Sequence, residues 1–242
     1  MKKKTAPGKG TGEALEIIAC RLSPDQMICC IADSHKRLFV YETSSWNLIR
    51  EFSTERKVSL ITFDSTGKRV LVADRTGDVY LIDLGPERVE PNVTLLLGHL
   101  SIILSLEMTR DDRFVVTADR DEKIRISHFP NGYNIQSYCL GHRQFVSSLV
   151  VLDDGRLISG SGDGTIKLWQ WEEGKLVWSM DCGAGHHIKQ IVKVSNQMIA
   201  VSFYCMKSVK LYSMTDDQKI TQHEVISVPE EILGMEWMGQ DS

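Results

Sequence analysis

The chain has 242 residues, of which 42% are hydrophobic and 25% charged, a composition typical of a soluble globular domain with a sizeable core. Its formal net charge of -4 argues against a surface that coats nucleic acid everywhere. No apolar run approaches the roughly 18 residues of a membrane helix, and the lysines at 2–4 precede no secretory apolar core. We therefore expect a protein that stays inside the cell.

Residues 1–13, MKKKTAPGKGTGE, combine four Lys with three Gly and few apolar side chains. Such a segment cannot bury enough surface to fold, so we predict a disordered basic tail. Its Gly-rich run lacks the preceding strand and the helix start that a phosphate-binding loop requires.

The first two modules, residues 14–57 and 58–97, are predicted to be antiparallel sheets of short strands. In the first, ALEIIACRL, MICCIA, RLFVYE and WNLIREF are separated by turn residues such as Ser23-Pro24-Asp25. In the second, SLITF, RVLVA and DVYLIDL surround turns at 64–67 and 74–77. We expect apolar packing between sheet faces to hold both modules together.

Three later modules share a Gly-His step. Gly98-His99, Gly141-His142 and Gly185-His186 recur 43 and 44 residues apart, and a fixed period of this size indicates repeated supersecondary units. The most complete unit is 141–184, where FVSSLVVL, RLIS and TIKLWQW are joined by hairpin turns at 153–155 and 162–164. The third module, 98–140, and the fifth, 185–227, are variations of it. After them, EEILGMEW at 230–237 is predicted to be the first strand of a partial sixth module, 228–242.

These modules resemble the WD-repeat β-propellers, whose blades carry a Gly-His near the start and a Trp-Asp-like end. The resemblance covers almost the whole chain and implies an all-β propeller with about five four-stranded blades plus a partial sixth. Rings of this family usually have seven blades, which need roughly 300 residues. We therefore expect this chain to be a partial sequence or a shortened isoform, missing a blade before residue 14 and at least one after 242.

In that family a His, a Ser or Thr, a turn Asp and a Trp form a buried hydrogen-bonded chain. The matching positions are His142, Ser159, Asp163 and Trp169 in the fourth module, and His99, Thr117 and Asp121 in the third. Ser127 replaces the Trp in the third module, so either a neighbouring blade fills the space or another protein uses it. The fifth module has Ser202 in register but Met206 in place of the Asp.

The strings LGHLS and DDRFVVTADRDEKIR carry a closer resemblance, to the non-catalytic WD-repeat subunits of eukaryotic tRNA (guanine-N7)-methyltransferase. The resemblance implies a heterodimer in which the propeller binds the catalytic subunit side-on and steadies it for tRNA. It also implies a location in the nucleus, or also in the cytoplasm. S-adenosylmethionine would be bound by that partner, and this chain would need no cofactor. The family places the TADRDEKIR blade at the interface, so the contact candidates are Arg120, Asp121, Glu122, Lys123 and Arg125. Arg125 is the first candidate because a guanidinium can pair bidentately with a partner carboxylate.

Signatures of catalysis and of metal binding are absent from the sequence. There is no HExxH, no GxSxG and no Gly-rich loop opening a helix, so we predict a protein that is not an enzyme. The six cysteines form no CxxC pair, which favours buried thiols over a metal site. The alternative function is a general WD-repeat scaffold or adaptor, such as a ubiquitin-ligase substrate receptor.

Overall fold

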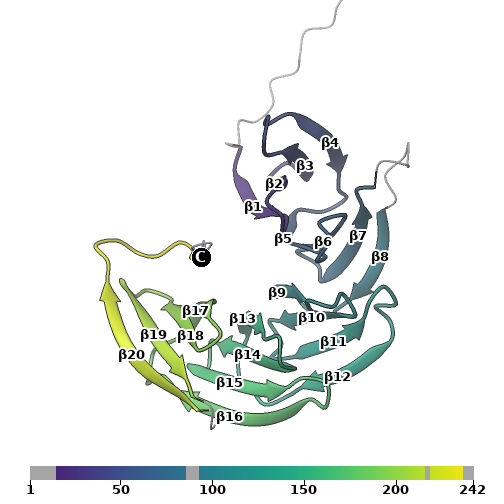
Figure 1. The fold of residues 1–242 in the computed structure, drawn as a ribbon. Coiled ribbons are helices and arrows are strands. Elements are labelled where there is room, and N and C mark those ends of the chain that lie inside the picture. Colours follow the sequence, from purple (N-terminus) through teal and green to yellow (C-terminus); the bar gives the residue numbers. More distant parts are fainter. Residues whose placement is uncertain (1–14, 86–92, 216–218, 237–242) are drawn as a thin grey trace, which may run out of the picture.

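The computed structural model describes residues 15–85, 93–215 and 219–236, and β-strands are the only regular secondary structure in these ranges. Twenty strands form five four-stranded antiparallel sheets, each made of four consecutive strands. The sheets follow one another in chain order along an arc, and the first strand of each lies nearest its centre (Figure 1). We call these sheets blades one to five. The predictions of an all-β fold and of four-stranded blades are confirmed.

Blades one and two consist of β1 (Ile17–Leu22), β2 (Ile28–Asp33), β3 (Arg37–Glu42), β4 (Leu48–Ser53), β5 (Val58–Phe63), β6 (Arg69–Asp74), β7 (Asp78–Asp83) and β8 (Val93–Gly98). Blades three and four consist of β9 (Ile103–Met108), β10 (Phe114–Asp119), β11 (Ile124–His128), β12 (Ile135–Cys139), β13 (Val146–Val151), β14 (Arg156–Ser161), β15 (Thr165–Gln170) and β16 (Lys175–Asp181). Blade five consists of β17 (Ile188–Ser195), β18 (Met198–Phe203), β19 (Ser208–Met214) and β20 (Ile220–Ser227).

The hydrophobic core lies between neighbouring blades, in four separate clusters. Strand alternation explains this arrangement, because successive side chains point to opposite faces of a sheet. In blade four, Leu157 packs toward blade three and the next residue, Ile158, packs toward blade five. Middle strands are therefore buried on both faces, as in β10, where all six residues are buried. Each blade is stabilised mainly by its neighbours.

Hairpin turns at the blade edges contain residues that accept a positive φ. Gly164, in the β14–β15 turn, has φ 80°, and its N–H donates to the carbonyl oxygen of Ser161 at 3.2 Å. Gly77, in the β6–β7 turn, has φ 100° and packs against the backbone oxygens of His99 and Ser101 in the next blade. A side chain at Gly77 would meet Ser101 O at 2.4 Å, so glycine here permits both the turn and the close approach of two blades.

The segment after β20 crosses back toward the centre of the arc (Figure 1). Its described part, 228–236, forms no strand, so the prediction of a sixth-module strand at 230–237 is wrong for these residues. Met235 instead exchanges two hydrogen bonds with the side-chain amide of Gln190 on β17, both 2.8 Å long. The partner of this backbone is therefore a side-chain amide of β17, and not the backbone of a strand. The predicted tail at 1–13 and residues 237–242 lie outside the described ranges.

Candidate partner-binding site

Blade four contains a buried hydrogen-bond chain that links β15 to the loop before β13. Trp169 donates from Nε1 to Ser159 Oγ at 2.8 Å, and Ser159 Oγ lies 2.8 Å from His142 Nε2. His142 Nδ1 lies 3.0 Å from Asp163 Oδ2. The four side chains that the sequence places in this chain therefore satisfy one another, which gives His142 a structural role.

One arrangement of protons satisfies every member of this chain. Burial lowers the pKa of His142, against the opposing influence of the Asp163 carboxylate. Burial acts to raise the pKa of Asp163, but hydrogen bonds from His142 and Thr165 outweigh it and hold that pKa well below its ordinary value. A neutral imidazole then donates from Nδ1 to an ionised Asp163 and accepts at Nε2 from the Ser159 hydroxyl.

Blade three contains a shorter version of the chain, with one correction to the prediction. His99 Nε2 lies 2.7 Å from Thr117 Oγ1, and His99 Nδ1 lies 3.0 Å from Oδ2 of Asp119, not of Asp121. Spacing from Thr117 suggested Asp121, because Asp163 follows Ser159 by four residues. Asp119 takes the position because it ends β10 beside the imidazole, while Asp121 accepts a hydrogen bond from Ser101 at 2.8 Å.

The space beside Ser127 is filled by Arg125, the leading contact candidate, from the same strand. Arg125 is buried and donates from Nε to Ser127 Oγ at 2.8 Å. Its two terminal nitrogens donate to the carbonyl oxygens of Gly98, at 3.1 Å, and of Gly132, at 2.6 Å. The guanidinium thus replaces the missing tryptophan as the donor in this part of the blade. Arg125 therefore has a structural role in blade three, and its contact with a partner stays a prediction.

Four other contact candidates, Arg120, Asp121, Glu122 and Lys123, form the β10–β11 turn, which we call the charged turn. All four are exposed. Asp119 constrains the backbone of the turn, because its Oδ1 accepts hydrogen bonds from the N–H groups of Asp121, at 2.9 Å, and Lys123, at 3.0 Å. The turn therefore holds two acidic and two basic side chains in solvent on a rigid backbone.

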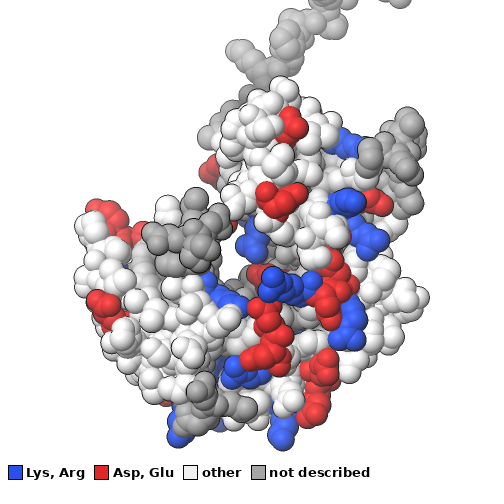
Figure 2. Space-filling model, in the orientation of Figure 1, with Lys and Arg blue, Asp and Glu red and all other residues white. Residues whose placement is uncertain are grey.

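The dense charge between Arg110 and Arg125 is divided between opposite ends of β10. Arg110 and Arg113 lie in the β9–β10 turn, roughly 20 Å along the strand from the charged turn. Arg110 pairs with Asp153 of blade four at 3.5 Å, and Arg113 pairs with Asp111 at 2.5 Å. Acidic and basic side chains lie intermixed over blades three and four in the view of Figure 2. The charged side chains of residues 110–125 therefore belong to two separate surfaces.

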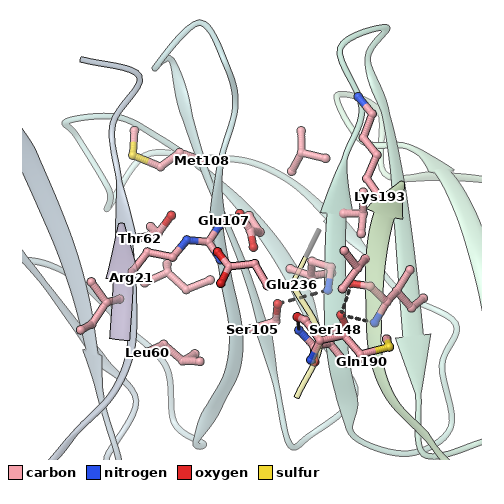
Figure 3. A pocket seen from close by; sticks show the side chains of 18 of the residues that line it. Arg21, Leu60, Thr62, Ser105, Glu107, Met108, Ser148, Gln190, Lys193 and Glu236 are labelled. Carbon is pink, nitrogen blue, oxygen red and sulfur yellow. Dashed lines mark hydrogen bonds and ion pairs between the residues drawn. The ribbon is translucent and has the colours of Figure 1, made fainter. Parts of the chain in front are cut away.

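A cavity of about 1050 Å³ lies at the centre of the arc and is lined by the first strands of the blades (Figure 3). Arg21 and Glu107 face each other across it at 3.8 Å. Ser148 accepts the N–H of Ile191 at 2.9 Å and so joins blades four and five. No His or Cys is found among the described residues that line the cavity, and its polar groups serve mainly to join blades.

Blade five lacks a complete chain. His186 Nδ1 and Ser202 Oγ are buried without a hydrogen-bond partner in the described part of the molecule. The sequence indicated this difference, since Met206 stands where Asp163 stands in blade four. The β18–β19 turn is also irregular, with Cys205 at φ 59°. Blade five is therefore the least well satisfied of the three Gly-His blades.

The described ranges contain no group of three or more His, Cys, Asp or Glu side chains that could hold a metal ion. Within the same ranges, no helix is long and apolar enough to span a membrane. The best-defined feature outside the core is the charged turn on blade three. A fan of four-stranded blades, two of them with the His-Ser/Thr-Asp chain, defines the molecule as a WD-repeat β-propeller.

Residues 86–242 match the family model described as the tRNA methyltransferase TRM82 WD40 domain, and the chain belongs to this family. The human tRNA (guanine-N(7)-)-methyltransferase non-catalytic subunit WDR4 is 39% identical over 183 residues, covering 72% of this chain and 43% of the human protein. The non-catalytic subunit wuho of Drosophila grimshawi is 34% identical over 229 residues, covering 90% of this chain and 59% of the fly protein. The chain thus spans about half the length of the curated relatives it matches.

Solved structures support the fold alone. A chain in a crystal structure of the mitotic checkpoint complex superposes with a TM-score of 0.79 at 15% identity, covering 91% of this chain and 68% of that one. The Cps50 (Swd1) β-propeller domain from Myceliophteria thermophila gives a TM-score of 0.74 at 11% identity, covering 89% of this chain and 73% of that domain. Both are β-rich propeller-like matches whose low identity carries no functional information.

Proposed function

We propose that this chain is a non-catalytic subunit that binds and steadies the catalytic subunit of a tRNA (guanine-N7)-methyltransferase. The proposal is supported by the family match and by the names of the relatives, which describe non-catalytic subunits of that enzyme. In this proposal the complex is a heterodimer, the partner binds S-adenosylmethionine, and tRNA is engaged by the complex. Its place in the cell would be the nucleus, with the cytoplasm as the alternative.

The family match carries the proposal, and the charged turn is the surface through which we propose that this chain binds its partner. Its backbone is fixed by Asp119, so its four exposed side chains can meet a partner without first losing backbone freedom. Charges at the rim of an interface orient the partners and suppress wrong ones. Arg120 and Asp121 retain 62% and 51% of their side-chain exposure, so they are available for such pairing.

Co-expression with the catalytic subunit, followed by co-purification and a tRNA methylation assay, tests the proposal. We expect Glu122→Lys to weaken co-purification and to reduce methylation of tRNA by the co-expressed pair. Glu51→Lys is the matched control, because Glu51 is equally an exposed glutamate but lies on β4 of blade one. Equal retention of partner and activity by both variants would remove the charged turn from the interface.

The same experiment also tests the alternative function, that of a general adaptor. If the wild-type chain fails to retain the catalytic subunit and instead recovers ubiquitin-ligase components from cells, the adaptor function replaces the one proposed here. In that case neither charge reversal would change tRNA methylation.

A further inference from the structure

Next to the charged turn, the loop formed by residues 98–101 carries one fully exposed apolar side chain. We call this segment the Leu100 loop. Leu100 has a relative exposure of 107%, the highest among the exposed large hydrophobic residues of the described chain. Single exposed leucines are common on protein surfaces and need no explanation by themselves. Here the surroundings of Leu100 supply one.

The Leu100 loop is held rigidly on both sides of Leu100. The His99 N–H donates to the carbonyl oxygen of Gly77 in blade two at 2.8 Å. The His99 ring is bonded to Asp119 and Thr117, as described above. Ser101 is buried and donates to Asp121 at 2.8 Å. A rigid loop that projects an apolar side chain loses little conformational entropy when a partner covers it.

The fold itself does not require an apolar residue at this position. The residue after the Gly-His step is Arg143 in blade four and His187 in blade five. Both are exposed, so the same turn is built with polar side chains in the two matched blades. A leucine in the third blade alone therefore has no structural explanation in the motif.

A hollow of about 200 Å³ lies beside Leu100 and connects it with the charged turn. Its wall includes Tyr138, which is 40% exposed on the edge strand β12, together with Asp121 and Lys123. Arg125 and Gly98 also line the hollow, and a hydrogen bond of 3.1 Å joins them. An apolar projection, a hollow and a charged rim thus occur together on one edge of blade three. Buried apolar anchors with a polar rim are typical of protein interfaces.

We propose that Leu100 is the apolar anchor of the interface with the catalytic methyltransferase subunit. It inserts into an apolar recess of that subunit while the hollow beside Tyr138 receives a partner side chain. The recess is bordered by groups of charge opposite to Glu122 and Lys123. This inference rests on the proposed function, since it names the residue through which the same edge of blade three would hold the same partner.

The test is the dissociation constant between the purified chain and the purified catalytic subunit. We expect Leu100→Ser to weaken binding by about tenfold or more, because a buried leucine side chain is lost from the interface. Leu100→Met, which conserves volume and apolar character, should remain close to wild type. Leu48→Ser is the control, since Leu48 is 48% exposed on β4 in blade one. Thermal unfolding of Leu100→Ser should match the wild type, because nothing in the described chain packs over this side chain.

Three outcomes would overturn the inference. If Leu100→Ser binds like the wild type while Glu122→Lys does not, the anchor is wrong and the proposed function stands. If Leu100→Ser abolishes self-association of the chain in light scattering and leaves the dissociation constant unchanged, the anchor serves a second copy. If the wild-type chain does not bind the catalytic subunit at all, the proposed function fails and the anchor fails with it.

Discussion

Replacing Arg125 by leucine should destabilise the protein, because the change removes three internal donors at once. The carbonyl oxygen of Gly132 and the hydroxyl of Ser127 lie in buried residues and would lose their donor, whereas Gly98 is exposed and can be hydrated. A buried polar group left without a partner costs about 1–3 kcal/mol. Two such groups would be left without a donor, while the cost of burying the Arg125 cation would no longer be incurred. The free energy of unfolding should therefore decrease by about 2–4 kcal/mol.

Thermal unfolding followed by circular dichroism would measure this loss. For a chain of this size, about 2–4 kcal/mol corresponds to a fall in Tm of roughly 5–15 °C. Arg120→Leu is the matched control, since Arg120 is exposed and forms an ion pair of 3.8 Å with Asp121, which is also exposed. Its Tm should stay within about 2 °C of the wild type. A Tm for Arg125→Leu equal to that of the control would refute the reasoning that the guanidinium holds blade three together.

Three further predictions concern the turns and the buried chain of blade four. The pKa of His142 is lowered from 6.5 in the folded protein, so the free energy of unfolding should be highest above pH 6.5 and should decrease as the pH falls below it. The pKa of Asp163 is also lowered, so a second decrease in the free energy of unfolding is expected below about pH 4. A Tm that rises from pH 7 to pH 5 would contradict this sign. Trp169→Phe removes the Nε1–H donor and should lower the free energy of unfolding by about 1–2 kcal/mol in urea denaturation. Gly77→Ala should lower the Tm more than Gly155→Ala does, because the new Cβ at Gly77 would lie 2.4 Å from a backbone oxygen. Gly155 also has a positive φ, of 82°, but nothing lies within 4 Å of its Cβ position. Equal decreases in Tm would show that blade two can shift to make room for the side chain.

The fold was largely predictable because its signals are local. Turn residues separate the short strands, and the Gly-His step recurs in three of the five blades, so the repeat period could be predicted from spacing. The strand expected at 230–237 was the exception. A strand needs a backbone partner as well as a suitable sequence, and Met235 found the side chain of Gln190 instead.

The site was less predictable because residue type does not report burial. Arg125 reads as a surface charge, yet the absence of a tryptophan at Ser127 creates the space that encloses it. Spacing alone could not distinguish Asp119 from Asp121, since both follow Thr117 within one turn. Leu100 was missed because a single leucine in a loop carries no periodic signal. Comparison of the three residues that follow the Gly-His steps would have singled it out.

The apolar clusters of the described residues lie between blades, and this placement determines which blades a destabilising substitution affects. Each blade draws its stability from nearest-neighbour interfaces, so the molecule should behave as a one-dimensional chain of coupled units. A destabilising substitution in blade three should lower the stability of blades two and four more than that of blades one and five. Amide exchange should therefore be slowest at β10 and β14, where neighbouring blades cover both faces of the strand.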